Sequence, residues 1–80
     1  MTIREEVIDA LVKKATQLFG AGNYGPETRF VEDLQVKSVD MVKFAALLED
    51  IYEVEVPFME ITQKQTFADA AAFIGQMFGE

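Results

Sequence analysis

The 80-residue sequence contains no cysteine, no histidine and no tryptophan. Without cysteine the chain has no disulfide, no thiolate nucleophile and no cysteine metal ligand, and without histidine it lacks the commonest general base. Most hydrolase chemistry is thereby excluded. Basic residues are also few, because 7 Lys and Arg stand against 14 Asp and Glu, for a formal charge of −7. The negative net charge disfavours binding to nucleic acid, because a protein that binds nucleic acid must neutralise its phosphates. It favours basic partners instead.

Long apolar runs are absent as well. No stretch approaches the ~18 apolar residues that a membrane span needs, and the N-terminus lacks the basic start and apolar block of a signal peptide. We therefore expect a soluble, cytoplasmic and monomeric protein. Half of the residues are hydrophobic, which favours a folded core over a disordered acidic tail. No internal repeat or linker divides the chain, so residues 1–80 are predicted to form one domain.

The apolar residues first recur at helical spacing over residues 3–19. Thr2 and Glu5 stand in the spacing of a capping box, in which each side chain satisfies a free backbone N–H at the helix start. The predicted core-facing residues of this helix are Ile3, Val7, Ile8, Leu11, Val12, Ala15, Leu18 and Phe19. Three glycines and a proline end the pattern and predict a long loop over residues 20–37, with two apolar anchors, Phe30 and Leu34.

A second helix is predicted over residues 38–52, a short one near Pro57, and a last one after Thr66, whose spacing to Asp69 again suits a cap. The core stripe of the second helix is predicted to hold Met41, Phe44, Ala45, Leu48, Ile51 and Tyr52. That of the last helix is predicted to hold Phe67, Ala70, Ala71, Ile74 and Phe78. The fold class is therefore all-α, a small up-and-down bundle of three main helices plus one short helix.

The opposite face of the second helix mixes charged and apolar side chains. Single exposed apolar residues are ordinary, but a line of them beside charges on one helix is better explained as a docking surface. With Asp40, the predicted partner-binding residues are Val39, Val42, Lys43, Ala46, Glu49, Asp50 and Glu53. An alternative for Lys43 is an ordinary surface ion pair with Asp50 or Glu53.

Ser38 is the one position that stands out as reactive, although a serine at the start of a helix is most often an N-cap. Its context is Glu32-Asp33-Leu34-Gln35 followed by Lys37-Ser38-Val39, with Glu55-Val56-Pro57 further along. This pattern, together with the order of the helices, resembles the acyl carrier proteins of fatty acid and polyketide synthesis. The family's signature is Glu-Asp-Leu-Gly and then Asp-Ser-Leu, so the serine is kept and its neighbours differ.

The resemblance implies a carrier protein that is not itself an enzyme. Ser38 would carry 4′-phosphopantetheine, derived from coenzyme A, whose thiol holds an acyl group as a thioester. The free N–H groups of a helix N-terminus favour such a phosphate, and Lys37 is a candidate contact for it. The implied partners are a phosphopantetheinyl transferase, and acyl-transfer and chain-elongation enzymes with basic docking patches. The expected pathway is fatty acid or related polyketide or specialised lipid biosynthesis.

The departures from the signature favour a specialised carrier. Lys37 and Lys43 stand where the family usually has acidic residues, and a reversed rim charge can reject an unwanted partner. Two alternatives stay open: an aminoacyl or peptidyl carrier, and an interaction module that kept the bundle but lost the modification. We also expect that the apolar interior, near residues 54–61, can open to admit an acyl chain.

Metal and nucleotide sites are not predicted. Glu32 and Asp33 are adjacent, but the other carboxylates lack the spacing of a Ca²⁺ loop. The run Gly20-Ala21-Gly22 lacks the pattern of a dinucleotide or P-loop site.

Overall fold

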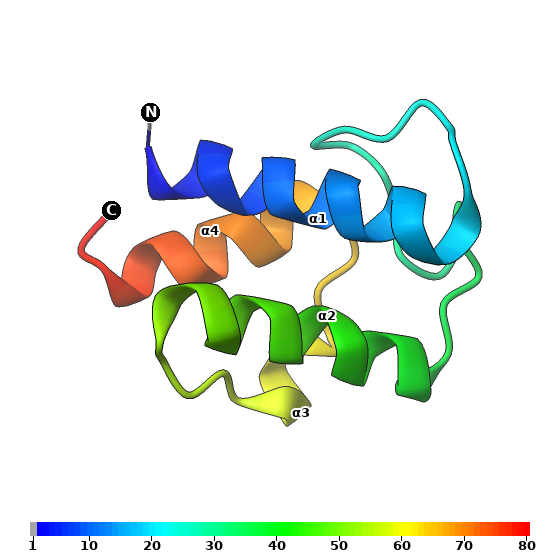
Figure 1. Cartoon of the computed structure of the whole chain (residues 1–80). Coiled ribbons are helices and arrows are strands. Elements are labelled where there is room, and N and C mark those ends of the chain that lie inside the picture. The colour runs from blue at the N-terminus through cyan, green and yellow to red at the C-terminus, as the bar shows by residue number, and fades with distance from the viewer. Residues whose placement is uncertain (1) are drawn as a thin grey trace.

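The computed structural model describes residues 2–80, and within them the chain forms four helices and no strands. The helices are α1 (Ile3–Phe19), α2 (Ser38–Tyr52), α3 (Phe58–Ile61) and α4 (Phe67–Met77). In Figure 1, α2 and α4 both run against α1, the short α3 lies beside α2, and the two ends of the chain lie at the same end of the bundle. The predicted all-α bundle is confirmed. No helix in the described part of the chain has the length and apolar content needed to cross a bilayer.

Hydrogen-bonded caps determine where α1 and α4 begin. The Thr2 hydroxyl accepts a hydrogen bond from the Glu5 N–H at 3.1 Å, and the Glu5 carboxylate accepts one from the Thr2 N–H at 3.0 Å. Thr66 and Asp69 make the same reciprocal pair at the start of α4. Each pair satisfies two backbone donors that would otherwise lack a partner, so both predicted capping boxes are confirmed.

Three buried phenylalanines occupy the centre of the bundle. The ring centroid of Phe30 lies 5.4 Å from that of Phe44 and 5.0 Å from that of Phe67. Such tilted and edge-on pairs are the favourable aromatic geometries. Phe30 belongs to the loop over residues 20–37, whereas Phe44 and Phe67 belong to α2 and α4. The predicted anchor Phe30 therefore fixes this loop to two helices at once, and Leu34 packs at the edge of the same core.

Backbone hydrogen bonds also join the loop to the start of α4. The Phe30 N–H donates to the Gln65 carbonyl at 2.9 Å, and the Phe67 N–H donates to the Thr28 carbonyl at 3.0 Å. These bonds form an isolated antiparallel bridge between Arg29 and Thr66. The last part of the loop before α2 is therefore held from both sides, by ring packing and by backbone pairing.

The prediction of burial is wrong for three residues. Ile51, Phe19 and Phe78 are exposed. Phe19 is the last residue of α1 and Phe78 is the first residue after α4, so both lie at helix ends. The Phe78 ring still packs on Tyr52, with centroids 5.6 Å apart. Ile51 lies within α2 but lines an open groove between α1 and α2, so no neighbouring helix covers its side chain.

Candidate functional site

Ser38 is the first residue of α2, one position later than an N-cap. The N-cap is Lys37, whose backbone is extended and whose carbonyl accepts hydrogen bonds from the N–H groups of Asp40 at 2.9 Å and Met41 at 3.0 Å. The Asp40 carboxylate in turn accepts a hydrogen bond from the Lys37 N–H at 3.0 Å. Ser38 therefore does not take the N-cap position that is usual for a serine at a helix start. The Asp40 carboxylate makes the local capping bond to the Lys37 N–H and leaves the serine hydroxyl unused within residues 2–80.

The Ser38 side chain is exposed, and its hydroxyl has no hydrogen-bond partner within residues 2–80. In the same part of the chain, the backbone N–H groups of Ser38 and Val39 have no backbone acceptor. The first N–H groups of a helix carry partial positive charge that attracts anions. An accessible hydroxyl beside these donors fits the chemistry of a serine-linked phosphodiester.

The backbone before Ser38 is held in an unusual conformation at Gln35. Its φ is 55°, in the left-handed region that glycine adopts without a Cβ clash. Its N–H donates to the Val31 carbonyl at 2.9 Å, and the next N–H, of Val36, donates to the Phe30 carbonyl at 3.0 Å. Gln35 stands at the position where the signature has glycine, so this turn explains the glycine. The turn brings the buried Val36 back onto the core directly before Lys37 and Ser38.

The predicted docking face lies on α2, adjacent to Ser38. Val39 and Val42 are exposed, as are Lys43, Ala46, Asp50 and Glu53, whereas Asp40 and Glu49 are half-buried. The face therefore presents apolar and charged side chains together. Its two half-buried carboxylates also have local structural roles.

Glu49 connects α2 to the loop that follows it. Its carboxylate accepts a hydrogen bond from the N–H of the buried Val56 at 2.9 Å. Between them, Glu53 ends α2 in a left-handed conformation with φ 54°. The sequence predicts only partner binding for Glu49, because nothing in the spacing of Glu49 and Val56 indicates this hydrogen bond.

The ion pairs of residues 2–80 join Asp9 to Lys13 and Arg29 to Glu32 and Asp33. None of them includes Lys43, so in this structure Lys43 does not form the alternative pair with Asp50 or Glu53. The Arg29 backbone N–H donates to the Asp33 carboxylate at 2.8 Å, and this bond, followed by that of the guanidinium, holds the pKa of Asp33 below its ordinary value. Glu32 and Asp33 are thus partners of Arg29 on the surface of the loop.

Comparison with known proteins gives the family. Residues 6–74 match the family described as "Phosphopantetheine attachment site". The chain is 37% identical over 54 residues to an acyl carrier protein of Helicobacter hepaticus, covering 68% of this chain and 71% of that protein. It is 32% identical over 76 residues to a meromycolate extension acyl carrier protein of Mycolicibacterium smegmatis, covering 92% and 77%.

An acyl carrier protein of Thermobifida fusca is 31% identical over 72 residues, covering 88% of this chain and 91% of that protein. The four-helix fold and the accessible hydroxyl beside free N–H groups agree with these similarities. The chain therefore belongs to the acyl carrier protein family, whose members are not enzymes and carry acyl intermediates of fatty acid or specialised lipid biosynthesis on covalently bound 4′-phosphopantetheine.

Proposed function

We propose that Ser38 is the residue that carries the 4′-phosphopantetheine arm, within a single carrier domain over residues 1–80. The observation that supports this most strongly is its position, because Ser38 is exposed at the N-terminus of α2 and its hydroxyl is not used in capping. It is also the one serine in the sequence. When bound, the arm supplies the thiol that this cysteine-free chain lacks.

The residues around Ser38 have separate tasks in this proposal. The free N–H groups at the start of α2 favour the negative charge of the phosphodiester. Lys37, exposed and directly before Ser38, adds a full positive charge close to the same oxygens. Asp40 fixes the backbone of Lys37 through its hydrogen bond, so the attachment point is held in place before any partner binds.

The family interacts with phosphopantetheinyl transferases and with acyl-handling enzymes. We propose that this chain docks on them through Val39, Val42 and Ala46, with Asp50 and Glu53 facing basic patches and Lys43 discriminating among partners. Apolar centres bounded by charges are typical of specific interfaces, and rim charges mainly set association rate and partner choice. The cargo is an acyl chain. We propose a monomer that works in the cytoplasm.

The test is the intact mass of the purified chain before and after incubation with coenzyme A, Mg²⁺ and a broad-specificity phosphopantetheinyl transferase. We expect a gain of one phosphopantetheine in the wild type and none in Ser38→Ala, with unchanged helical circular dichroism in the variant. Thr66→Ala is the control, since it removes a hydroxyl at the start of another helix and should still be loaded. Loading of Ser38→Ala, or loss of its fold, contradicts the assignment.

If neither this enzyme nor transferases from the source cell load the wild type, the chain is an unmodified interaction module. If it loads but accepts aminoacyl rather than acyl groups from the respective ligases, it is an aminoacyl or peptidyl carrier.

A further inference from the structure

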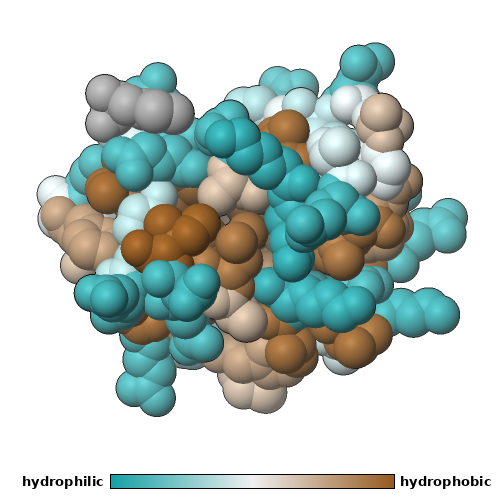
Figure 2. Space-filling view, in the orientation of Figure 1, coloured by the Kyte–Doolittle hydropathy of each residue, from teal (hydrophilic) through white to brown (hydrophobic). Residues whose placement is uncertain are grey.

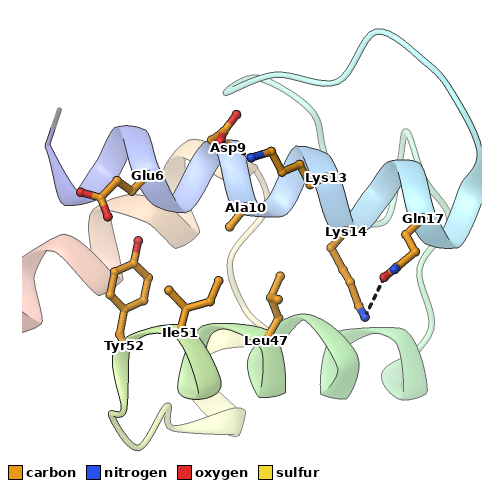
Figure 3. Close-up of a pocket in the computed structure, with 9 residues that line it drawn as sticks. All are labelled: Glu6, Asp9, Ala10, Lys13, Lys14, Gln17, Leu47, Ile51 and Tyr52. Carbon is orange, nitrogen blue, oxygen red and sulfur yellow. Dashed lines mark hydrogen bonds and ion pairs between the residues drawn. The ribbon is translucent and has the colours of Figure 1, made fainter.

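An open groove of about 440 Å³ lies between α1 and α2 (Figure 3). The side chains of Leu47, Ile51 and Tyr52 point into it from α2, and Ala10 lies opposite them on α1. Figure 2 shows hydrophobic side chains gathered across the middle of this face with hydrophilic ones on both sides. The middle of the groove is therefore an apolar floor, which these four residues define.

The groove is a separate surface from the docking face on α2. Ile51 lies nine residues, or about two and a half turns, from Val42, so the two side chains point to opposite sides of the helix. Ile51 is 48% exposed and Val42 is 50% exposed. An uncovered apolar side chain therefore lies on each of two opposite sides of α2, and the docking face accounts for one of them.

The charges along the groove are separated by sign. Glu6 lies at the end beside Tyr52 and belongs to no ion pair within residues 2–80 (Figure 3). Burial, followed by the negative charge of Glu6, raises the pKa of Tyr52. Asp9 and Lys13, further along α1, pair with each other at 3.1 Å and neutralise one another. The end of the groove beside Tyr52 is therefore acidic.

The opposite end, toward the start of α2, is basic. The half-buried Lys14 points from α1 toward α2 and donates to the Gln17 side-chain oxygen at 3.2 Å (Figure 3). Lys43 precedes Leu47 by four residues, so it lies one turn further along the same side of α2. Neither Lys14 nor Lys43 pairs with a carboxylate in the described part of the chain. An occupant that brings a carboxylate to this end therefore supplies a partner that the chain itself does not.

The length and shape of the groove suit a helix. Glu6 and Gln17 line its two ends and lie eleven residues apart on α1, which is about 16 Å or roughly three helical turns. A helix of this length presents apolar side chains at intervals of three and four residues as one stripe. Ala10 lies in the middle of the α1 side, and its short side chain leaves room for such a stripe.

Other occupants fit the groove less well. A second copy facing it across a two-fold axis would place one groove against another and leave the space between them unfilled. Each copy also has a formal charge of −7, so two copies repel one another. The same charge disfavours nucleic acid and anionic lipid surfaces. A helix, in contrast, enters the groove and can match the charge at each end.

We propose that the groove between α1 and α2 binds an amphipathic helix of a partner protein. The apolar stripe of that helix lies on the floor, a carboxylate lies beside Lys14, and a basic side chain lies beside Glu6. Because Ile51 and Val42 lie on opposite sides of α2, a helix bound in the groove leaves the docking face free for the enzymes that act on the arm. Binding here does not require modification of Ser38.

The test uses the full-length, unmodified chain with isotope-labelled methyl groups, and synthetic peptides of about 14 residues as probes. Each peptide carries leucines at intervals of three and four residues and a covalent staple on its opposite face, because a free helix this short is only marginally stable in water. One peptide has lysines at one end and glutamates at the other. We expect saturable shifts of the methyl signals of Ala10, Leu47 and Ile51 and none at Val39 or Val42.

Variants on opposite sides of α2 provide a matched comparison. Ile51→Gln should weaken binding of this peptide about tenfold, because it removes apolar area that the peptide would bury. Val42→Gln is the same kind of change on the docking face and should leave the affinity unchanged. Ala10→Gln narrows the groove from α1 and should also weaken binding. Circular dichroism establishes that each variant is folded.

Two more peptides, with lysines at both ends or glutamates at both ends, test the order of the charges. At about 0.15 M salt, which screens the net charge, the wild type should bind the mixed peptide two- to fivefold more tightly than either, as expected for about one exposed ion pair. Lys14→Glu should shift the preference to the peptide with lysines at both ends, and Glu6→Lys to the one with glutamates. Lys64→Glu changes the charge equally outside the groove and should keep the wild-type preference.

Three outcomes would overturn the proposal. The first is that the mixed peptide gives no saturable shifts below about 1 mM, or shifts Val39 and Val42 in place of the groove residues. The second is that Lys14→Glu and Glu6→Lys leave the order of the three affinities unchanged, which would remove the charge match. The third is that the groove signals shift with protein concentration and sedimentation shows dimers, which would assign the groove to a second copy. None of these outcomes affects the assignment of Ser38, because the chain in this test carries no arm.

Discussion

Replacing Glu49 by alanine removes the carboxylate that accepts the Val56 N–H at 2.9 Å. A hydrogen bond to a charged group contributes about 1.5 to 3 kcal/mol, and because Glu49 is half-buried we take the lower value, about 1.5 kcal/mol. A domain of this length is stable by about 4 to 12 kcal/mol, so the loss is a measurable fraction. For this size of protein, it lowers the melting temperature by about 6 to 12 °C.

The assay is thermal unfolding followed by circular dichroism, together with hydrogen exchange of the Val56 amide. We expect Glu49→Ala to unfold earlier and to exchange this amide faster, since its acceptor is gone. Glu49→Gln keeps an acceptor oxygen and should preserve most of the protection. Asp50→Ala is the control for the docking face, because Asp50 is exposed on the same helix. It should weaken binding to a basic partner and leave unfolding unchanged. If Glu49→Ala unfolds like Asp50→Ala and keeps a protected Val56 amide, the structural role assigned to Glu49 is wrong.

Two further substitutions test the loop before α2. Gln35→Gly should stabilise the protein by up to about 1.5 kcal/mol in urea unfolding. Relief of the left-handed conformation gains about 1 to 2 kcal/mol, and the added freedom of glycine in the unfolded chain costs about 0.5 to 1. A lower unfolding midpoint would contradict the strain assigned to Gln35. The pKa of Asp33 is lowered by the Arg29 backbone and guanidinium, so this pair stabilises the fold above the ordinary value of 3.8 and the contribution is lost as pH falls below it. Below about pH 4, the unfolding midpoint of Asp33→Asn should therefore fall less steeply with decreasing pH than that of the wild type. If both proteins lose stability equally steeply, the Arg29–Asp33 pair is not the source of the loss.

The helix boundaries could be predicted because their causes are local. Capping pairs such as Thr2 with Glu5 act over three residues, and the periodicity of α1 and α2 is carried by consecutive turns. The start of α2 at Ser38 agrees with the helix predicted over residues 38–52. Its cap depends on the spacing of Lys37 and Asp40, in which only the Asp40 carboxylate accepts a hydrogen bond, because a lysine side chain has no acceptor. The carboxylate alone is enough to set the start of α2.

The exposure of Ile51 could not be predicted from its own helix. A helical wheel gives the direction in which a side chain points from the helix axis. Whether that side chain is buried also depends on whether a neighbouring helix packs against it at the same position along the axis. At Ile51 the neighbour α1 leaves a groove. The bond from Glu49 to Val56 is similar, because it depends on how the chain turns after α2, which the left-handed residue Glu53 decides.

The bridge between Arg29 and Thr66 determines where this chain tolerates added length. Residues 21–23 are exposed and lie outside the bridge, so a peptide inserted there lengthens a loop, and each doubling of loop length costs only about 0.6 kcal/mol. One residue inserted between Thr28 and Phe30 has a different effect. It shifts the pairing by one position, and a shift by one residue turns side chains to the opposite face. Phe30 would then leave the aromatic centre, and the start of α4 and the approach to Ser38 would lose their shared support together.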